Sequence, residues 1–333
     1  MKIIIPMAGM GKRMRPHTLT IPKPLIKIAG KPIVQRLSEG IVKVAGQDVD
    51  EIAFIIGDFG AEVEKTLIGI AESLGAKGSI YYQREALGTA HAINCAAESM
   101  QGNVIVAFAD TLFDADFKLD ADKDGIIWTH KVADPSAFGV VKKDADGVIT
   151  DFVEKPAEFV SDEAIIGIYY FRDGENLQKE LQYLMDNNIV KGGEYQLTDA
   201  LENMKLKGLK FYSGQVDEWL DCGNKDATVY TNNRVLALSK EDKLMADSAK
   251  FTNTHIIQPC FIGENVIIEN SVVGPHVSIG ENTLISNSVI SNSIIGSDTK
   301  IEGGYIDNAM VGSSVTYSKS ADDLSIGDFS TVK

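Results

Sequence analysis

The chain has 333 residues, of which 44% are hydrophobic, so it can bury a sizeable core and has the length of about two domains. Its formal net charge of −15 excludes a protein that wraps nucleic acid, because a polyanion partner requires a basic surface. Its three cysteines are widely separated, which excludes a disulfide framework and a CxxC metal or redox pair and predicts a cytoplasmic protein. No apolar run is long enough for a signal-peptide core or a membrane span, so we expect neither.

The distribution of charge is uneven. Residues 1–38 contain eight Lys and Arg residues and no Asp or Glu. A basic run is often only a solvated surface. Here, however, the cations flank glycines and prolines, so the segment also fits a loop that binds an anion.

The first 110 residues alternate between predicted strands and helices, which favours a parallel sheet covered on both faces. The buried strands are expected at 3–5, 52–56, 80–82 and 104–108, and the helices at 33–45, 63–74 and 90–97. Ligands of such sheets bind at the carboxyl ends of the strands. The segments 7–24 and 83–89, together with Asp110, are therefore predicted to surround one crevice.

Residues 125–250 mix strands and helices and are interpreted as the remainder of the same domain. Strands are expected at 126–132, 148–153, 165–171 and 209–212, and helices at 174–187, 196–207 and 225–240. The fold class of this part is therefore α/β, with a Rossmann-like, doubly wound mixed sheet.

A short repeat begins at Phe251. Ile262-Gly263-Glu264-Asn265 returns as Ile279-Gly280-Glu281-Asn282, and an Ile-Gly or Val-Gly pair recurs at 295, 311 and 326. Within each period a branched residue recurs every five or six positions, which predicts three short strands per coil of a triangular parallel β-helix. The isoleucines are interpreted as core, and the repeat by itself indicates no chemistry.

The segment 1–34 reads as a strand, a glycine-containing loop with several cations, and a Pro-Lys-Pro step before a helix. Gly9 and Gly11 allow backbone N–H groups to approach a phosphate, and Arg13 and Lys23 supply positive charge. A dinucleotide-binding loop is excluded because Met14 stands where its third glycine belongs. A P-loop is excluded because Arg13, and not Ser or Thr, follows Lys12.

These residues resemble the sugar-1-phosphate nucleotidyltransferase family, whose signature is a Gly-x-Gly-x-Arg-x-x-Pro loop followed by Pro-Lys-Pro. The resemblance covers the whole chain. It implies a catalytic domain at 1–245 and a hexapeptide-repeat β-helix at 251–333, and the left-handed sense of this helix is likewise implied by the resemblance alone.

The resemblance implies a role for each loop residue. Gly9, Gly11 and the preceding Ala8 match the loop that holds the nucleotide phosphates, while Arg13 and Lys23 match the catalytic cations. Lys12 replaces the Ser or Thr that is common before the arginine, which removes one hydroxyl contact.

The segment Gln83 to His91 resembles the part of the family that reads a pyrimidine base. Gln83 and the backbone of Gly88 match the groups on the base, and Thr89 belongs to the same nucleotide site. A glutamine amide offers both a donor and an acceptor, as a uracil or thymine edge requires.

Asp110 ends the apolar run 104–109, so its carboxylate is expected at the carboxyl end of a strand, where Mg²⁺ can be held by one or two carboxylates and substrate phosphate oxygens. The resemblance implies that Asp221, in Trp-Leu-Asp-Cys-Gly, is the second metal ligand. Taken singly, a strand-end aspartate is more often a turn or cap residue. The order of the motifs along the chain favours the metal site.

The resemblance places the sugar 1-phosphate at Glu154-Lys155-Pro156. Glu154 matches a residue that accepts hydrogen bonds from sugar hydroxyls, and Lys155 matches a partner of the sugar phosphate. Gly139 and Gly167 match backbone positions of the same pocket. An isolated Glu-Lys pair is otherwise a surface ion pair that contributes little.

The predicted function is therefore Mg²⁺-dependent transfer of a nucleoside monophosphate from dTTP or UTP to glucose 1-phosphate, with release of pyrophosphate. Alternatives are N-acetylglucosamine 1-phosphate with UTP and mannose 1-phosphate with GTP. Uridylyl enzymes for the acetamido sugar tend to have Asn where Ile165 stands, and Trp-Leu-Asp-x-Gly is closer to glucose-specific relatives. An alternative of another class is a regulatory subunit that binds nucleotide sugars without turnover.

The repeat is expected to organise assembly, and a homo-oligomer is predicted. The segments 228–238 and 242–249 are expected to link the two domains. Some β-helix proteins are acyltransferases that use a histidine base, but His255 and His276 are interpreted here as structural or solvated. Small-molecule substrates are the only other partners expected, with neither nucleic acid nor a membrane.

Overall fold

The computed structural model describes residues 1–116, 118–239, 244–321, 323 and 325–331. Contacts divide the chain into two compact units. The first, here the sheet unit, comprises Met1–Ile26 and Lys31–Gly223, and the second, here the repeat unit, comprises Lys27–Gly30 and Asn224–Lys333. The predicted domain boundaries at 245 and 251 stay a prediction, and residues 242 and 243 of the predicted 242–249 linker lie outside the described residues.

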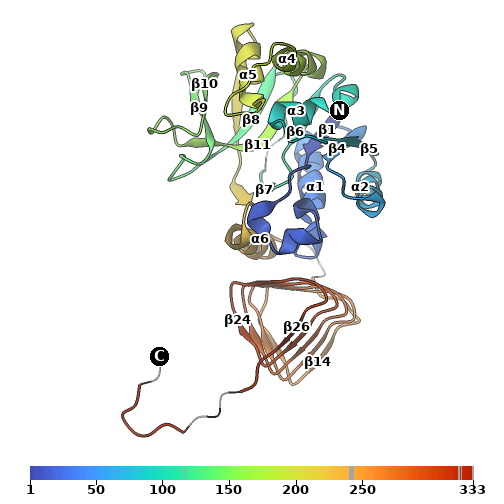
Figure 1. The fold of residues 1–333 in the computed structure, drawn as a ribbon, viewed down its shortest axis with the longest axis vertical. Coiled ribbons are helices and arrows are strands. Elements are labelled where there is room, and N and C mark those ends of the chain that lie inside the picture. Colours follow the sequence, from blue (N-terminus) through green and yellow to red (C-terminus); the bar gives the residue numbers. More distant parts are fainter. Residues whose placement is uncertain (117, 240–243, 322, 324, 332–333) are drawn as a thin grey trace. The chain divides into compact units, whose positions relative to one another are not determined.

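A mixed, nine-stranded sheet forms the centre of the sheet unit (Figure 1). Its order is β10-β9-β11-β6-β1-β4-β5, and β8 pairs with both β11 and β12. The strands β6, β1, β4 and β5 are parallel, whereas β11 runs antiparallel to β6 and β8. The predicted fold class is confirmed. The strands are β1 (Lys2–Pro6), β4 (Glu51–Ile56), β5 (Lys77–Tyr82), β6 (Val104–Ala107), β8 (Gly125–Lys131), β9 (Gly139–Lys143), β10 (Ile149–Glu154), β11 (Glu163–Phe171) and β12 (Phe211–Gln215).

The helices of the sheet unit follow the predicted apolar spacing, with one correction. The predicted helix at 90–97 is interrupted, because Ala96 leaves the helical conformation (φ −100°, ψ 29°) between α3 and a short 3₁₀ helix. The helices are α1 (Ile33–Ala45), α2 (Ala61–Ser73), α3 (Thr89–Asn94), α4 (Gly174–Asp186) and α5 (Leu197–Leu206), and the 3₁₀ helices are η1 (Lys12–Met14), η2 (His17–Leu19), η3 (Lys23–Leu25) and η4 (Ala97–Ser99).

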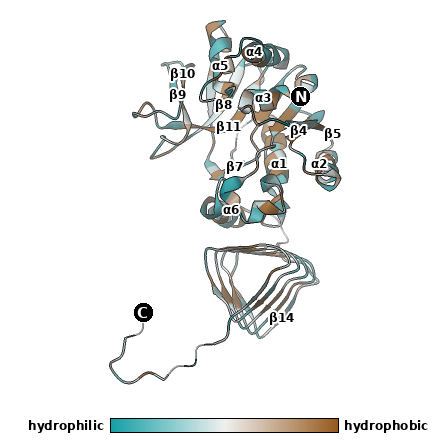
Figure 2. Ribbon diagram, viewed as in Figure 1, coloured by the Kyte–Doolittle hydropathy of each residue, from teal (hydrophilic) through white to brown (hydrophobic). Residues whose placement is uncertain are grey.

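The core of the sheet unit forms because every other residue of a strand faces the same side. Ile4, Val104 and Val106 of the central strands join buried side chains of α3, α4 and α5 in one apolar cluster. The neighbours Ile3 and Ile5 are equally buried, so the strands carry continuous apolar runs that are typical of parallel strands buried on both faces. Figure 2 shows this hydrophobic colouring around β4 and along α1.

Two further strands of the sheet unit, β7 (Thr111–Asp114) and β13 (Glu218–Asp221), form a separate antiparallel pair. The sequence analysis predicts neither of them, nor β9. Each of the two is only four residues long and follows or precedes a loop, so it has no periodicity of its own.

In the repeat unit, short strands form three parallel sheets that stack as a triangular coil (Figure 1). The sheet orders are β14-β17-β20-β23-β26, β15-β18-β21-β24 and β16-β19-β22-β25. One helix, α6 (Lys225–Leu238), precedes the coil. The strands are β14 (Lys250–Thr252), β15 (His255–Ile256), β16 (Cys260–Ile262), β17 (Ile267–Glu269), β18 (Val272–Val273), β19 (Val277–Ile279), β20 (Leu284–Ser286), β21 (Val289–Ile290), β22 (Ser293–Ile295), β23 (Lys300–Glu302), β24 (Tyr305–Ile306), β25 (Met310–Val311) and β26 (Thr316–Ser318).

The branched residues predicted to point inward form the core of the coil. Within the cluster Ile268, Ile285 and Ile301 are fully buried, while Ile306 and Val311 near the last coils are partly buried. The corners use asparagines with positive φ, such as Asn265 (φ 57°), because asparagine tolerates this conformation better than most residues.

The last predicted repeat does not continue the coil. The described residues after β26 form no strand, and Ile326 is 51% exposed. The side chain of an inward residue is buried only when its own coil and the neighbouring coils surround it. Because no described strand follows β26, Ile326 has no such coil around it. The handedness of the helix stays a prediction. None of the helices in the described chain is long and apolar enough to cross a bilayer.

Candidate active site

A cavity of about 570 Å³ opens at the carboxyl ends of β1, β5 and β6, where the sequence predicts a crevice. The structure brings most of the predicted nucleotide and metal residues to this cavity, but five predicted residues are not part of its lining. The lining includes Ala8, Gly9, Gly11, Arg13, Lys23, Gln83, Gly88, Thr89 and Asp110. Those outside it are Gly139, Glu154, Lys155, Gly167 and Asp221.

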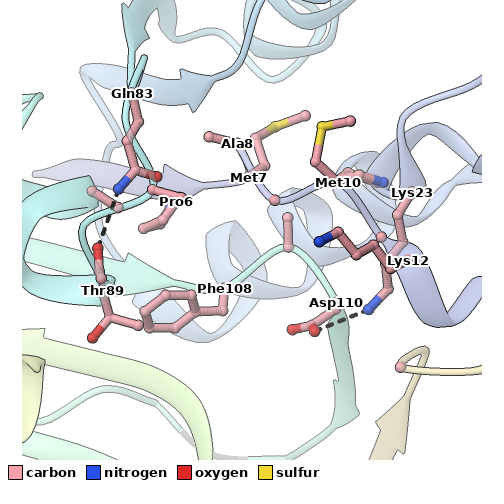
Figure 3. A pocket seen from close by; sticks show the side chains of 18 of the residues that line it. Pro6, Met7, Ala8, Met10, Lys12, Lys23, Gln83, Thr89, Phe108 and Asp110 are labelled. Atoms are coloured by element: carbon pink, nitrogen blue, oxygen red, sulfur yellow. Dashed lines mark hydrogen bonds and ion pairs between the residues drawn. The ribbon is translucent and has the colours of Figure 1, made fainter. Parts of the chain in front are cut away.

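The cavity has two chemically distinct ends. Figure 3 shows Gln83 and Thr89 at one end and Lys12, Lys23 and Asp110 at the other. The first end offers an amide and a hydroxyl group, and the second offers opposite charges. A nucleotide has a neutral base at one end and an anionic phosphate chain at the other, so its polarity matches that of the cavity.

The loop after β1 is shaped by Gly11, which adopts φ +56°. A Cβ at this position would lie 3.0 Å from Thr18 Cγ2 and 3.1 Å from Lys23 Cβ, so a glycine lets the loop fold closely over Lys23. The Thr18 hydroxyl donates a hydrogen bond to the Gly11 carbonyl at 2.8 Å. Gly9 has open space around its Cα, which leaves its backbone accessible from the cavity.

The loop around Gly11 packs on Lys23, whose side chain carries a positive charge into the site. It is only 8% exposed, and its Nζ lies 2.9 Å from Asp110 Oδ2. A buried ammonium group is costly unless it is paired, and Asp110 provides this partner for Lys23. The side chain of Asp110 is 44% exposed, so the carboxylate also faces the cavity.

The β7–β13 pair brings Asp221 to Asp110. Asp221 is the register partner of Thr111, the residue after Asp110, and the Cys222 N–H donates to the Asp110 carbonyl at 2.9 Å. Gly223 follows, and a Cβ at this position would lie 2.9 Å from Asp221 Oδ2 and 3.2 Å from Arg13 Nη2. The glycine therefore makes room for the carboxylate and the guanidinium side by side.

The electrostatics of Asp221 reflect this crowding. Burial raises the pKa of its carboxyl group, and the nearby negative charge of Asp110 raises it further. The charges of Lys23 and Arg13 and the N–H of Gly223 act in the opposite direction. The nearby cations and the N–H group therefore do not fully offset the effects of burial and of Asp110 on Asp221.

The carboxylates of the site bear on whether it can hold a divalent ion. The described residues contain no cluster of three or more His, Cys, Asp or Glu side chains that could hold a metal by themselves. Asp110, directly before β7, and Asp221, at the end of β13, provide two hard oxygen ligands. This donor set fits Mg²⁺, which binds through one or two carboxylates and completes its shell with substrate phosphates and water.

At the other end of the cavity the side chain of Gln83 is oriented by the protein. Its Nε2 donates to the Gly88 carbonyl at 3.2 Å and lies 3.1 Å from His91 Nδ1. This arrangement occupies the amide nitrogen and leaves Oε1 as an acceptor for a ligand. Thr89 is held as well, because its hydroxyl oxygen accepts the Leu197 N–H at 3.0 Å.

Gly88 is required by packing. It has φ +110°, and a Cβ would come within 2.5 Å of the Tyr195 carbonyl oxygen. The neighbouring Glu194 also lines the cavity, a residue that the sequence analysis does not identify. In the sequence, Glu194 is marked only by the preceding Gly192-Gly193 pair. Glu194 lies far from Gly88 along the chain, so no local pattern predicts that the two residues are neighbours.

The predicted sugar residues form a second group, on β9, β10 and β11. Glu154 is paired in register with Gly139, and a Cβ on Gly139 would lie 3.0 Å from Glu154 Oε2. Lys155 has φ +42°, and its Nζ lies 3.7 Å from Glu154 Oε1. The Lys155 side chain is 67% exposed, so the ion pair contributes little to stability and leaves the cation available.

Gly167 connects this group to the cavity. Its carbonyl accepts the N–H of Phe108, which lines the cavity, at 2.9 Å. Phe108 packs edge-to-face on Tyr169 with ring centroids 6.3 Å apart. Burial and the charge of Glu154 raise the pKa of Tyr169, so this hydroxyl lies near Glu154 and stays protonated. Neither aromatic residue is predicted from the sequence, where both look like core residues.

Comparison with known proteins shows the family of the chain. Residues 2–237 match the family model described as Nucleotidyl transferase. The chain belongs to the Nucleotidyl transferase family. It is therefore an enzyme, and the predicted membership of the sugar-1-phosphate nucleotidyltransferases is confirmed.

Several members of this family resemble the chain over different lengths. It is 28% identical to a glucose-1-phosphate thymidylyltransferase of Streptomyces antibioticus, over 84% of this chain and 82% of the relative. It is 31% identical to a Methanococcus maripaludis bifunctional protein GlmU, over 83% and 62%. It is 34% identical to a mannose-1-phosphate guanylyltransferase catalytic subunit beta of Drosophila melanogaster, over 51% and 48%, so it spans about half the length of that relative.

Solved structures show the same fold. A UDP-glucose pyrophosphorylase complexed with UDP-glucose is 25% identical and has a TM-score of 0.59, covering 72% of this chain and 99% of that structure. A second structure, a Bacillus anthracis protein, has a TM-score of 0.60 at 21% identity over 72% of this chain and 97% of its own, and it supports the fold alone.

The raised pKa of Asp221 leads to a prediction on stability. A folded-state pKa above the unfolded value means that ionisation of Asp221 opposes folding as the pH rises through that range. The change Asp221→Asn should therefore raise the melting temperature of the metal-free protein by a few degrees at neutral pH. The gain should shrink at acidic pH, where the wild-type carboxyl group is protonated.

Thermal melting between pH 4 and pH 8 in the presence of a chelator measures this effect. The change Asp217→Asn, at an exposed aspartate before β13, is the matched control and should show no such gain. A melting temperature of Asp221→Asn that is lower than the wild-type value at neutral pH would show that the carboxylate stabilises the fold.

Proposed function

We propose that the enzyme transfers a nucleoside monophosphate from dTTP or UTP to glucose 1-phosphate with Mg²⁺, releasing pyrophosphate and an NDP-sugar. The observation that carries the proposal is the convergence of two cations and one carboxylate at one end of a nucleotide-sized cavity, with a second carboxylate close to them outside the lining. Arg13 and Lys23 lie there beside Asp110 and Asp221.

The triphosphate binds with its phosphates at the cationic end. The backbone of Ala8 to Gly11 lies against the phosphate chain, and Arg13 and Lys23 offset its negative charge. Because Lys23 is buried, its charge acts in a medium of lower dielectric than water and is screened less. Asp110 holds the Lys23 ammonium group through the ion pair at 2.9 Å.

Asp110 and Asp221 hold Mg²⁺ in this proposal. The ion supplies Lewis-acid stabilisation of the charge that develops on the phosphate oxygens. The protein itself holds the two carboxylates together through β7 and β13, and Arg13 beside Asp221 keeps that carboxylate oriented.

The chemical step is an in-line displacement. An oxygen of the sugar phosphate attacks the α-phosphorus, the bond from this phosphorus to the bridging oxygen breaks, and pyrophosphate leaves on the opposite side. The protein contributes positioning and charge stabilisation through Arg13 and Lys23. No nucleophilic side chain is needed.

The preference for a pyrimidine rests on Gln83. Its amide nitrogen is held by Gly88, so its Oε1 is placed to accept the imide N–H of uracil or thymine. The thymidylyl and UDP-glucose relatives support this choice of base and of glucose.

The sugar 1-phosphate occupies the group on β9, β10 and β11. Glu154 accepts hydrogen bonds from sugar hydroxyls, and the exposed Lys155 pairs with the sugar phosphate. The backbones of Gly139 and Gly167 complete this pocket. The hydrogen bond from the Phe108 N–H to the Gly167 carbonyl connects this pocket to the cavity wall.

N-acetylglucosamine 1-phosphate with UTP, and mannose 1-phosphate with GTP, are the alternative substrate pairs, and the relatives include both kinds of enzyme. A regulatory subunit without turnover could lose its charged residues, whereas here all four remain together. Homo-oligomerisation and a cytoplasmic location stay predictions.

A substrate panel tests the proposed function. Five nucleoside triphosphates are combined with four sugar 1-phosphates in Mg²⁺, and pyrophosphate release is measured. We expect the highest kcat/KM for dTTP or UTP with glucose 1-phosphate. A preference for GTP would refute the pyrimidine assignment, and no release with any pair would refute the enzymatic proposal.

The change Asp110→Asn should reduce turnover by roughly a hundredfold or more, because a metal ligand loses its charge while the side chain keeps its shape. Steady-state pyrophosphate release measures the effect. Asp114→Asn, at the other end of β7, is the matched control and should retain activity. Turnover of Asp110→Asn within about tenfold of the wild-type value would remove Asp110 from the metal site.

The change Lys23→Ala should lower kcat more than it raises the KM for the triphosphate. The charge of Lys23 matters most when charge develops in the transition state, and a loss of roughly 10- to 1000-fold in kcat is expected. Lys31→Ala, in the same basic segment, is the control. If only KM changes, Lys23 is a binding residue.

The change Gln83→Ala should weaken the use of dTTP and UTP by roughly 1 to 3 kcal/mol in kcat/KM, because the buried base edge loses its partner. ATP and GTP should be affected less, so the ratio of pyrimidine to purine efficiencies is the quantity to measure. An equal loss for all four triphosphates would show that Gln83 does not read the base.

A further inference from the structure

The loop after β1 fixes the backbone of Lys12 on both sides. The preceding Gly11 turns the chain with positive φ, and its carbonyl accepts the Thr18 hydroxyl at 2.8 Å and the Met14 N–H at 2.9 Å. The Lys12 carbonyl accepts the Arg15 N–H at 3.3 Å. Lys12 therefore starts η1 from a fixed place at the charged end of the cavity (Figure 3).

The side chain of Lys12 carries a charge that the protein does not pair. Lys12 is exposed, and it makes no ion pair or side-chain hydrogen bond with any residue that the structure describes. Residues 1–38 contain no Asp or Glu, so no carboxylate of the same segment can neutralise it. An exposed lysine is often only solvated, but Lys12 lines the cavity of the proposed triphosphate. Its ammonium group is therefore available to an anionic ligand.

The other two cations of the site lie beside carboxylates. Lys23 is only 8% exposed and pairs with Asp110 at 2.9 Å, and the charge of Arg13 acts on the neighbouring Asp221. Both cations therefore belong to the region where the proposed metal and the reacting α-phosphorus lie. The exposed Lys12 differs from them, because its charge is compensated by neither carboxylate and faces the solvent side of the cavity.

The phosphates that leave are the part of the triphosphate that suits such a cation. The β- and γ-phosphates lie furthest from the base, and they must reach solvent when they depart as pyrophosphate. They also carry more negative charge than the α-phosphate, which is bonded on both sides. A compact ammonium group on a flexible stem binds phosphate oxygens as a point charge.

We propose that Lys12 binds the β- and γ-phosphates of the triphosphate and the pyrophosphate that they become. This inference rests on the proposed function and deepens its phosphate end. When the bond between the α-phosphorus and the bridging oxygen breaks, its electron pair stays with pyrophosphate, and Lys12 offsets part of the resulting charge. An ammonium group thus takes the place of the hydroxyl group that is common in the family at this position.

The test compares three variants of the full-length protein in the reverse reaction. In this direction a pyrophosphate oxygen attacks the nucleotidyl phosphorus of the NDP-sugar, and sugar 1-phosphate leaves. Lys12→Met removes the charge and keeps a side chain of similar shape, whereas Lys12→Arg keeps the charge. Arg15→Met is the matched control, because Arg15 is an exposed cation three residues away that is not part of the cavity lining.

The KM for pyrophosphate, the KM for the NDP-sugar and kcat are measured in Mg²⁺. For Lys12→Met we expect the KM for pyrophosphate to rise about tenfold, because one charged contact to this substrate is lost. The KM for the NDP-sugar should stay unchanged. Lys12→Arg and Arg15→Met should stay within about threefold of the wild-type values. An unfolded fraction lowers the apparent kcat and not KM, so a folding defect cannot imitate this result.

A KM for pyrophosphate in Lys12→Met within about threefold of the wild-type value would overturn the proposal. An equal rise in Arg15→Met would also overturn it, since the general field of the loop would then account for the effect. So would a rise confined to the KM for the NDP-sugar. A failure of the proposed function is recognised separately, because the unmodified protein then releases no pyrophosphate with any substrate pair.

Discussion

The pairing of β7 with β13 is the constraint on which the candidate site depends. It places Asp221 beside Asp110 and carries Gly223 to Arg13, so that the Asp221 carboxylate lies close to the Asp110 carboxylate and the Arg13 guanidinium that line one end of the cavity. The arrangement is unfavourable in the substrate-free protein, as the raised pKa of Asp221 indicates. Such concentrations of charge are typical of functional sites, where a ligand supplies the missing compensation.

The parallel strands supply the frame for this arrangement. Because β1, β5 and β6 end at the same edge of the sheet, the glycine loop, the Gln83 segment and Asp110 all open into one cavity. Glycines at 11 and 88 are necessary for different reasons: Gly11 lets the loop close over Lys23, and Gly88 lets the base segment pack on Tyr195. The two ends of the cavity therefore have fixed and different chemistries.

The repeat unit has a simpler physical basis. Each coil covers the apolar interior of its neighbour, so residues such as Ile285 are buried without any contribution from the sheet unit. On this regular coil the polar contacts of Asn232 stand out, since they join a helix, a β-helix coil and the 27–30 turn.

The sequence by itself determined the features that depend on local periodicity and short motifs: the αβ alternation, the inward isoleucines of the coil, and the glycine loop with its cations. These follow from residues that are close together in the chain, and the structure contains them except for the last repeat, at Ile326, and the continuous helix predicted at 90–97. The resemblance to the family supplied Asp221 and Glu154 as candidates, with no local signal to support either. Only the tertiary structure decided that Asp221 meets Asp110, that Phe108 contacts Gly167 and Tyr169, and that residues 27–30 pack on α6. Each of these contacts joins segments far apart in the sequence through short strands or single side chains, and such elements carry no periodic pattern that could predict their partners.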